Sequence, residues 1–564
     1  MLDLLMLGRI QLSKNNLKTW LILGIILLFA SFLRLYDLGS VPLGFHIDEA
    51  SLGYNAYSLL LTGKDENNNS LPLYIDMFGD NRPSGYHYLT ILPIKILGLN
   101  EFATRLPGAL FGILMILPIY FFSQLLFKNK RVSLLAAILV TMAPWSIVLS
   151  RASAETIVSL FWIISGFALV IAGIQKRSPI YFFAGAISLS LSFFFYHTPR
   201  VFVPLLFLCF ILFLFPVWGK FSKNVKMSLI FSFLVVSLIS FSLVFLIKGG
   251  TGRFSQVNIF NAPGTQLILD EQIREDGNQN ISQLITRFTH NKITNYSIAF
   301  VSNYLEYFSG QFLFIQGGWP NWYKVPGMGL LYLVELPFII VGIFYLLLSK
   351  DIFHKLPLVW LLIAPVVAAI TVDDVPNLQR AIVMFPIIGL IVALGFVKII
   401  EKYPGKLSKL FIAIFAIFLL YNFSYFLHQY FIQTQVHRNW YRYEGFDKMM
   451  KIVKDNYLNT NGIIISKSFG GIYPLVLFYM QYDPVQYQKE GSPKDKPGKG
   501  FGKFYFANSE CPSYNLDPSI PIAKNTIIID SGNCKDYKGL NLLKHTNLYR
   551  KDGTRAFRII YVSI

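Results

Sequence analysis

Two adjacent acids, Asp48 and Glu49, stand in the stretch "PLGFHIDEASLGYNAY", directly after a long apolar run. A carboxylate at such a place can accept the proton of an attacking hydroxyl, or it can hold a divalent cation. A simpler explanation is structural, because Asp48 could cap an expected helix over 49–61. The pair therefore predicts either a catalytic carboxylate or a helix cap.

Further charged residues gather at the ends of apolar runs rather than inside them, where charge is costly. For each a structural role stays open: Arg105 can snorkel from the start of its apolar run, and Arg151 and Glu155 are spaced four apart, as for an ion pair on one helix face. Taken as a set, cations and acids predict a cavity that binds a phosphate and performs acid–base chemistry. Arginine binds phosphate oxygens bidentately, and the candidate ligands are Arg82, Arg151, Arg200 and Arg380.

Other side chains are candidates for weaker roles. Trp319 can stack on a sugar ring or anchor the chain at a membrane interface, and the second role is the more common one. His87 and His197 are single histidines, which usually pack and hydrogen-bond; with Tyr54 they complete the candidate substrate contacts. Cys511 and Cys534 lie in the polar tail and could form a disulfide, although their spacing does not decide it.

The elements that must position these residues are membrane helices. Of the 564 residues 54% are hydrophobic and 14% are charged, against about 25% charged residues in soluble domains. The net charge of +19 comes from short basic clusters between apolar runs rather than from one patch, so nucleic acid is excluded as a partner. The composition predicts a polytopic membrane protein surrounded by lipid.

Eleven runs are long enough to be spanning helices, which need about 20 apolar residues. Lys and Arg clusters such as 128–131, 220–226 and 398–409 follow alternate runs, which places them in the cytoplasm and predicts a cytoplasmic N-terminus and an extracytoplasmic C-terminus in the cytoplasmic membrane. The segment 86–99 is expected to be interfacial. The predicted spans are 18–36, 102–127, 132–150, 154–174, 179–197, 199–218, 226–247, 328–348, 355–371, 380–399 and 407–428.

Two domains follow from this pattern. Residues 1–428 form the membrane domain, with outer loops 37–101 and 248–327, and residues 429–564 form an extracytoplasmic tail. The tail mixes one amphipathic helical pattern with short β-rich runs, which is typical of a small α/β domain. The expected elements are a helix over 445–458 and strands over 462–468, 525–532 and 557–564.

The segments "FHIDEASLGYNAYSLLLTGKD", "FGDNRPSGYHYL" and "GLNEFATRLPGALFGIL" resemble the N-terminal third of bacterial GT-C glycosyltransferases. That superfamily includes protein O-mannosyltransferases and the transferase that adds aminoarabinose to lipid A. The resemblance extends over about 40–400 and is strongest over 42–155. It implies a GT-C-like fold of about eleven transmembrane helices with the small tail domain, and the transfer of a sugar from a polyprenyl-phosphate carrier to a protein, lipid or glycan acceptor.

The resemblance also assigns roles. Asp48 matches the leading acid of the family and is the expected general base, while Glu49 matches the second acid and would orient it. Glu155 matches a further acidic position, where the family more often has Asp, and is the third expected catalytic residue. Arg82 falls where a Lys is common in a "KPP" tract, here "NRPSG", and is the expected phosphate ligand. If the reaction uses a divalent cation, Asp48 and Glu155 are its expected ligands.

Three other functions stay open, and one of them is a non-catalytic scaffold whose tail recruits wall or surface partners. A transporter or flippase would move the lipid-linked sugar without cleaving it, but it should place polar residues near the midplane of repeated halves, which this sequence does not show. An oligosaccharyltransferase-type enzyme would glycosylate asparagine, and the "WWD"-type motif expected of it is missing. A glycosyltransferase with a lipid-phosphate sugar donor is therefore the preferred hypothesis.

Overall fold

The structure, a computed structural model, describes residues 14–77, 79–247, 249–261, 263–466, 471–491, 500–515, 518, 520, 522–536 and 544–562. The chain forms two compact units. The helical unit is drawn from residues 1–34, 108–150 and 154–426, and the sheet unit from residues 35–107, 151–153 and 427–564. The first predicted outer loop and the tail thus belong to the same unit.

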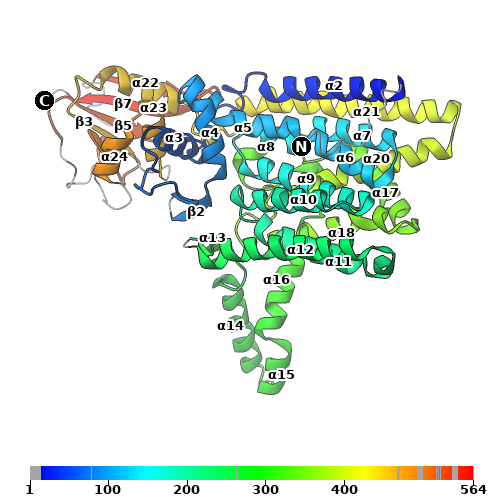
Figure 1. Ribbon diagram of the computed structural model, residues 1–564. Helices are drawn as coiled ribbons and strands as arrows, with labels where there is room; N and C mark the ends of the chain where they lie inside the picture. Colours follow the sequence, from blue (N-terminus) through cyan, green and yellow to red (C-terminus); the bar gives the residue numbers. More distant parts are fainter. Residues whose placement is uncertain are drawn as a thin grey trace. The chain divides into compact units, whose positions relative to one another are not determined.

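Long apolar helices make up most of the helical unit (Figure 1). Two of them, α9 and α20, are almost wholly buried because neighbours surround them: α9 packs against α6 and α10, and α20 packs against α7 and α17. The helices are α2 (Lys14–Leu35), α6 (Ile116–Phe127), α7 (Lys130–Met142), α8 (Pro144–Ser150), α9 (Glu155–Lys176), α10 (Pro179–Leu191), α11 (Pro199–Phe213), α12 (Lys223–Phe241), α17 (Leu336–Leu348), α18 (Leu356–Ile363), α19 (Val366–Ala369), α20 (Phe385–Lys402) and α21 (Lys406–Phe431).

The prediction of a multi-pass α-helical membrane protein is confirmed. In the described residues, 7 helices are long and apolar enough to cross a membrane, and the pair α7–α8, bent by 54° at Pro144, brings the number to 8. Proline bends a helix because its ring removes a backbone hydrogen bond. The predicted spans 179–197, 199–218 and 328–348 correspond to shorter apolar helices. Every predicted span therefore coincides with a helix or a bent pair.

The predicted outer loop 248–327 is largely helical, which the sequence did not indicate. Its helices are capped by their own polar residues: the Ser282 hydroxyl accepts from the Ile285 N–H, and the Asn291 side chain accepts from the Thr294 N–H. In Figure 1 this arm projects from the helical unit crosswise to α12. The arm comprises α14 (Pro263–Asn278), α15 (Gln283–Thr289) and α16 (Lys292–Glu306), and α13 (Gly252–Val257) precedes it in the chain.

A five-stranded sheet organises the sheet unit. Its strands lie in the order β4, β3, β5, β7, β6, with β3 parallel to β4 and β5, and with β7 antiparallel to β5 and β6. The central strands read as continuous isoleucine runs because both of their faces are buried. The predicted strands at 462–468, 525–532 and 557–564 are confirmed where the structure describes them, and 467–468 and 563–564 lie outside the described residues. The strands are β3 (Gly462–Ser466), β4 (Phe504–Ala507), β5 (Thr526–Ser531), β6 (Lys544–Tyr549) and β7 (Arg555–Val562).

Helix α3 connects the first loop to the core of the sheet unit, where it packs against α4 and α23. A Cβ at Gly53 would lie 2.6 Å from the Phe478 ring and 2.7 Å from Thr104 Oγ1, so glycine allows this close approach. Cys511 and Cys534 form a disulfide. The remaining elements are α3 (Ile47–Thr62), β1 (Tyr74–Met77), β2 (Asp80–Pro83), α4 (Gly85–Leu97), α5 (Glu101–Leu114), α22 (Phe446–Asn456), α23 (Tyr473–Met480) and α24 (Pro484–Glu490).

Candidate active site

The acid pair lies in the first turn of α3, and the residue that caps this helix is His46. Its Nδ1 accepts a hydrogen bond from the Asp48 N–H at 3.2 Å, and the Glu49 carboxylate accepts from the His46 N–H at 3.3 Å. Together they form a capping box, with histidine in the place usually taken by Ser or Thr. The interpretation of Asp48 as the cap is therefore wrong, and its side chain is left for another role.

The Asp48 carboxylate is half-buried and lies beside a cation. Arg82 Nη2 donates to Asp48 Oδ2 at 3.2 Å, and His46 Nδ1 lies 3.6 Å from the same oxygen. Arg82 is held by the antiparallel hairpin β1–β2, and its Nε donates to Asp80 at 3.4 Å. The side chains of Asp48 and Arg82 are 23% and 26% exposed, so a molecule in solvent can reach both.

Glu49 has a different environment, because it is buried at the centre of an ion network. Arg105 Nε donates to its Oε1 at 2.9 Å, Arg442 Nη2 donates to its Oε2, and Ser153 Oγ donates to Oε1 at 3.2 Å. Burial raises the pKa of Glu49, but the charges of Arg105 and Arg442 outweigh this effect and hold the pKa below its usual value. A buried carboxylate that already accepts several hydrogen bonds holds its neighbours in place rather than accepting a proton from substrate.

Two expectations about neighbouring arginines need correction. Arg105 does not snorkel: it is fully buried, and it also donates to the carbonyls of Leu38 and Gly44. Arg151 lies in a turn before α9 rather than on a helix face with Glu155.

Arg151 is fully buried, and its guanidinium ties together parts of the sheet unit. It donates to the Val41 carbonyl at 3.0 Å and lies 5.1 Å from the centre of the Phe431 ring. Both of these contacts are therefore made with groups of the protein itself.

Two histidines near Asp48 are held neutral. Burial lowers the pKa of His46 to about 4, against the opposing pull of Asp48. Burial likewise lowers the pKa of His87 to about 3, and the charge of Arg82 lowers it further. Neither ring nitrogen of His87 makes a hydrogen bond of normal geometry with the described residues. Tyr54, the other candidate contact in this unit, is buried and donates to the Tyr482 carbonyl at 3.1 Å.

These histidines predict a loss of stability in mild acid. The folded state keeps His46 neutral down to about pH 4, whereas the unfolded chain binds a proton below about pH 6.5. Stability should therefore fall as the pH drops from about 6.5 to about 4, by roughly 3 kcal/mol from His46 alone. Thermal unfolding of the purified chain at several pH values measures this. In the matched variant His46→Asn, asparagine can cap the helix but does not titrate, so the pH dependence should be shallower; identical profiles would contradict the assignment.

The remaining candidate residues lie in the helical unit. Arg200 Nη2 donates to the Phe193 carbonyl at 2.8 Å, and its Nη1 lies 3.3 Å from His197 Nδ1. Arg380 pairs with Asp373 at 2.8 Å and donates to Thr371 Oγ1 at 2.8 Å. Arg200 and Arg380 are nearly buried and bound by groups of the protein. Glu155, also buried, is the first residue of α9.

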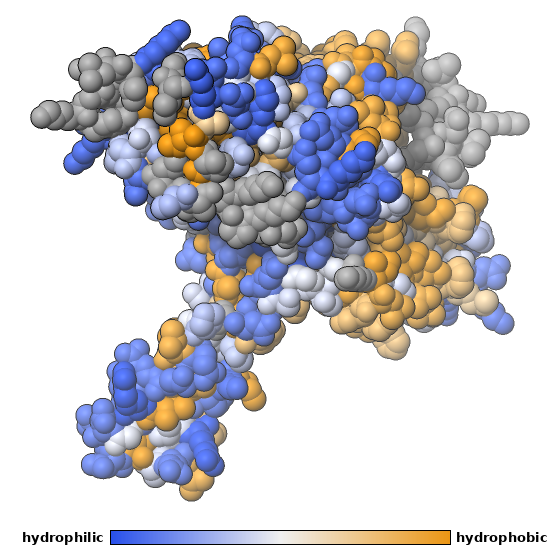
Figure 2. All heavy atoms as spheres, turned by 90° about the vertical axis from the view of Figure 1, so that its left-hand side faces the viewer, coloured by the Kyte–Doolittle hydropathy of each residue, from blue (hydrophilic) through white to orange (hydrophobic). Residues whose placement is uncertain are grey.

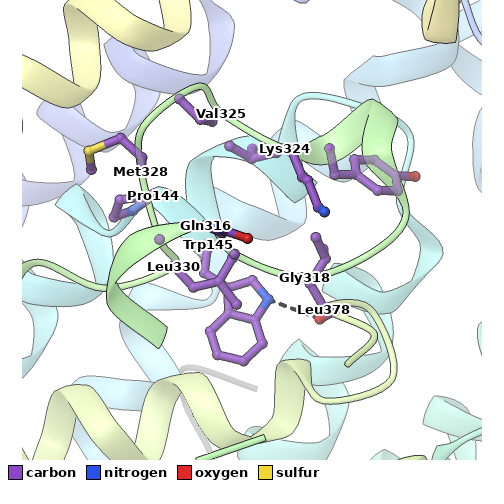
Figure 3. A pocket seen from close by; sticks show the side chains of 13 residues that line it. Pro144, Trp145, Gln316, Gly318, Lys324, Val325, Met328, Leu330 and Leu378 are labelled. Carbon is purple, nitrogen blue, oxygen red and sulfur yellow. Dashed lines mark hydrogen bonds between the residues drawn. The ribbon is translucent and has the colours of Figure 1, made fainter. Parts of the chain in front are cut away.

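A small hollow opens beside the bend between α7 and α8 (Figure 3). Trp145 forms its floor and donates through its indole N–H to the Leu378 carbonyl at 2.9 Å. Lys324 also lines it, and its ammonium lies 4.1 Å from the centre of the Trp319 ring. Trp319 is exposed, and one face of its ring contacts the Lys324 ammonium. This geometry is compatible with both predicted roles, stacking on a sugar ring and anchoring the chain at a membrane interface.

The structure brings together only part of the predicted set. Asp48, Glu49, Arg82, His87, Tyr54 and Arg151 belong to the sheet unit, while Glu155, Arg200, Arg380, His197 and Trp319 belong to the helical unit. Sequence reasoning missed Arg442, which neutralises Glu49 from 393 residues away. It also missed His46, which stands two residues before Asp48.

The surroundings of Asp48 fit a divalent cation poorly. A cation at Oδ2 would meet the positive charge of Arg82 at close range, and like charges repel strongly at such separations. Within the described part of the chain, no group of three or more His, Cys, Asp or Glu side chains is arranged to hold a metal ion.

Comparison with known proteins finds one partial match to a family model and several similar structures. Residues 81–245 match the family model described as dolichyl-phosphate-mannose-protein mannosyltransferase. ArnT from Cupriavidus metallidurans, solved with undecaprenyl phosphate bound, is similar in structure with a TM-score of 0.53 at 12% identity, over 95% of this chain and 98% of that one. No curated protein is significantly similar to the chain in sequence.

A second solved structure agrees. The archaeal oligosaccharyltransferase AglB from Archaeoglobus fulgidus, in complex with an inhibitory peptide and a dolichol-phosphate, matches with a TM-score of 0.52 at 15% identity. The match covers 83% of this chain, which spans 64% of the AglB chain. At these identities the likenesses show a common fold, which this chain shares with ArnT and AglB.

Proposed function

We propose that this chain, which has the GT-C glycosyltransferase fold, transfers a sugar from a polyprenyl-phosphate carrier to an acceptor at the outer face of the cytoplasmic membrane. The observation that carries the proposal is the accessible carboxylate of Asp48, 3.2 Å from the guanidinium of Arg82 at the start of α3. A base and a phosphate-binding cation are the two groups that such a transfer needs side by side.

In the proposed reaction the acceptor hydroxyl attacks the anomeric carbon of the donor sugar. The bond between that carbon and the phosphate oxygen breaks, and the carrier phosphate leaves with the electron pair. The hydroxyl proton passes to Asp48 Oδ2, while Arg82 stabilises the charge that develops on the phosphate. Direct displacement of this kind inverts the configuration of the anomeric carbon.

The other residues take supporting roles in this proposal. Glu49 acts as a positioning residue, since its ion network fixes the start of α3 on which Asp48 stands. Arg200 and Arg380 are secondary candidates for the carrier phosphate, once their present partners are exchanged, and Glu155 stays a candidate catalytic acid. Arg151 is reassigned from phosphate ligand to structural anchor, because its guanidinium is wholly buried.

The nature of the donor is supported by the relatives. ArnT was solved with undecaprenyl phosphate and AglB with a dolichol-phosphate, so we propose a lipid-phosphate donor carrying a hexose or a pentose. The acceptor is a protein, lipid or glycan. The orientation, with the C-terminus outside the cytoplasm, is supported by the disulfide between Cys511 and Cys534, because disulfides persist mainly outside the reducing cytosol.

The function can be tested with the full chain reconstituted in liposomes that contain a polyprenyl-phosphate sugar and a hydroxyl-bearing acceptor. Mass spectrometry should detect the free polyprenyl phosphate and a glycosylated acceptor, both dependent on the protein. If the labelled donor instead crosses the bilayer intact, the protein is a flippase and the proposal is wrong. Comparing hexosyl and pentosyl donors in the same assay identifies the sugar class.

A further inference from the structure

The arm α14–α16 exposes large apolar side chains where a water-soluble hairpin would bury them. Leu284 and Phe288 on α15 are 81% and 84% exposed, and Ile293 on α16 is 80% exposed. Leu284, Ile285 and Phe288 follow the spacing of one helix face, and the exposed residues Ile298, Val301 and Leu305 do the same on α16. These six residues form what we call the outer stripe.

The interior of the arm contains buried polar groups beside one buried leucine, Leu269 on α14. Asn295 is buried and donates through its amide to Gln272 at 2.9 Å, while His290 pairs with Asp276 at 3.0 Å between α14 and the end of α15. Thr286 is also buried. Helices packed through polar groups with apolar residues outside are typical of segments whose solvent is lipid, because there no hydrophobic force drives apolar side chains inward.

The arm is attached at membrane depth. Asn303 donates to the carbonyls of Ala369 and Thr371, at the end of the spanning segment Ile352–Ala369. Tyr304 donates to the Leu362 carbonyl at 2.8 Å, inside that segment. Seven residues separate Leu362 from Ala369, which corresponds to about 10 Å along a helix. The base of α16 therefore lies against the part of the bundle that lipid surrounds.

The outer stripe continues the lipid-facing surface of the bundle. The membrane-length helix Lys223–Leu246, which leads into the arm, exposes Phe231, Leu238 and Phe245 in the same way. Figure 2 shows the arm as the lowest lobe, with hydrophobic and hydrophilic side chains at its surface. In Figure 1 it extends crosswise to α12, whose length and apolar composition suit a membrane span, so the arm does not run parallel to that helix.

We propose that α15 and α16 lie in the interfacial layer of the bilayer, with the outer stripe inserted among phospholipid chains. The opposite helix, α14, exposes Leu267, Ile268 and Ile273 as well as three acids, and its acidic side is the one that faces water. The acids are Asp270, Glu271 and Glu275. Arg287 and Lys292 flank the stripe and reach the phosphates of the headgroups. Only the choice of leaflet, the extracytoplasmic one, rests on the proposed function and its orientation.

The test measures how deeply the arm lies in lipid. In a Cys209→Ser background that keeps the disulfide, a nitroxide is attached at Phe288→Cys and, as a matched control, at Glu271→Cys on α14. The full chain is reconstituted in vesicles of phosphatidylethanolamine and phosphatidylglycerol. Collisions with oxygen, relative to collisions with a water-soluble nickel complex, should be several-fold more frequent at position 288 than at position 271.

Equal access of the nickel complex to both positions overturns the proposal. Spectral broadening from contacts between nitroxides at position 288, growing with the density of protein in the vesicles, would show that the outer stripe contacts a second copy of the chain. That result also overturns the proposal. Leu305→Cys provides a second probe of the stripe if Phe288→Cys does not fold. None of these measurements requires turnover, so their outcome is independent of whether the chain transfers sugar.

Discussion

Replacing Asp48 with asparagine should slow sugar transfer by about 10²- to 10⁴-fold, the range that a general base contributes. The amide has the shape of the carboxylate and can still accept a hydrogen bond from Arg82, so the donor should bind much as before. It cannot take the proton of the acceptor hydroxyl. Initial rates over a range of donor concentrations should therefore show a fall in kcat with little change in KM.

The matched control is Asp76→Asn in the hairpin β1–β2. That carboxylate accepts a hydrogen bond from the Gly79 N–H at 2.7 Å and has no proposed part in the chemistry. The control should retain a rate close to that of the wild type. If Asp48→Asn folds normally and keeps the wild-type kcat, Asp48 is not the base.

Replacing Glu49 with glutamine should lower the free energy of unfolding by about 3–5 kcal/mol, as is typical when one partner of a buried ion pair is removed. The change would leave the guanidinium groups of Arg105 and Arg442 buried without a counter-charge. Chemical or thermal unfolding of the purified chain measures the loss.

Two comparisons make this result specific. Asp447→Asn, in the exposed first turn of α22, removes an acid from the same unit and should cost less than about 1 kcal/mol. Folded Glu49→Gln protein should transfer sugar faster than Asp48→Asn, because Glu49 is a positioning residue. A stable Glu49→Gln chain whose kcat falls as far as that of Asp48→Asn would reverse the roles of the two acids.

Local patterns were sufficient for the helices that cross the membrane. An apolar run such as 154–174 has few folded alternatives, since lipid requires every backbone group to bond within its own segment. The isoleucine runs of β3 and β5 were recognisable for a similar reason. Strand β6, "KHTNLY", was missed because it is an edge strand with polar, half-exposed side chains.

The site was only partly predictable. Asp48 and Arg82 lie in the same predicted outer loop, 37–101, so the sequence alone could suggest that they act together. The ion network of Glu49 could not, because Arg442 comes from the other end of the chain and nothing in "NWYRYEGF" indicates a buried cation. Histidine is not among the usual N-cap residues, so His46 offered no sign that it frees Asp48 from capping. Such tertiary pairings depend on the whole fold rather than on nearby residues.

The pairing of Glu49 with Arg442 also determines when the ion network can form during synthesis of the chain. The ribosome must add 393 residues between the two partners, which takes about 20–80 s at 5–20 residues per second. During that interval Glu49 has already been delivered to the membrane, whereas Arg442, the second cation of its ion network, has not yet been synthesised. A nascent enzyme is therefore expected to stay inactive, and open to quality-control proteases, until its last quarter has emerged.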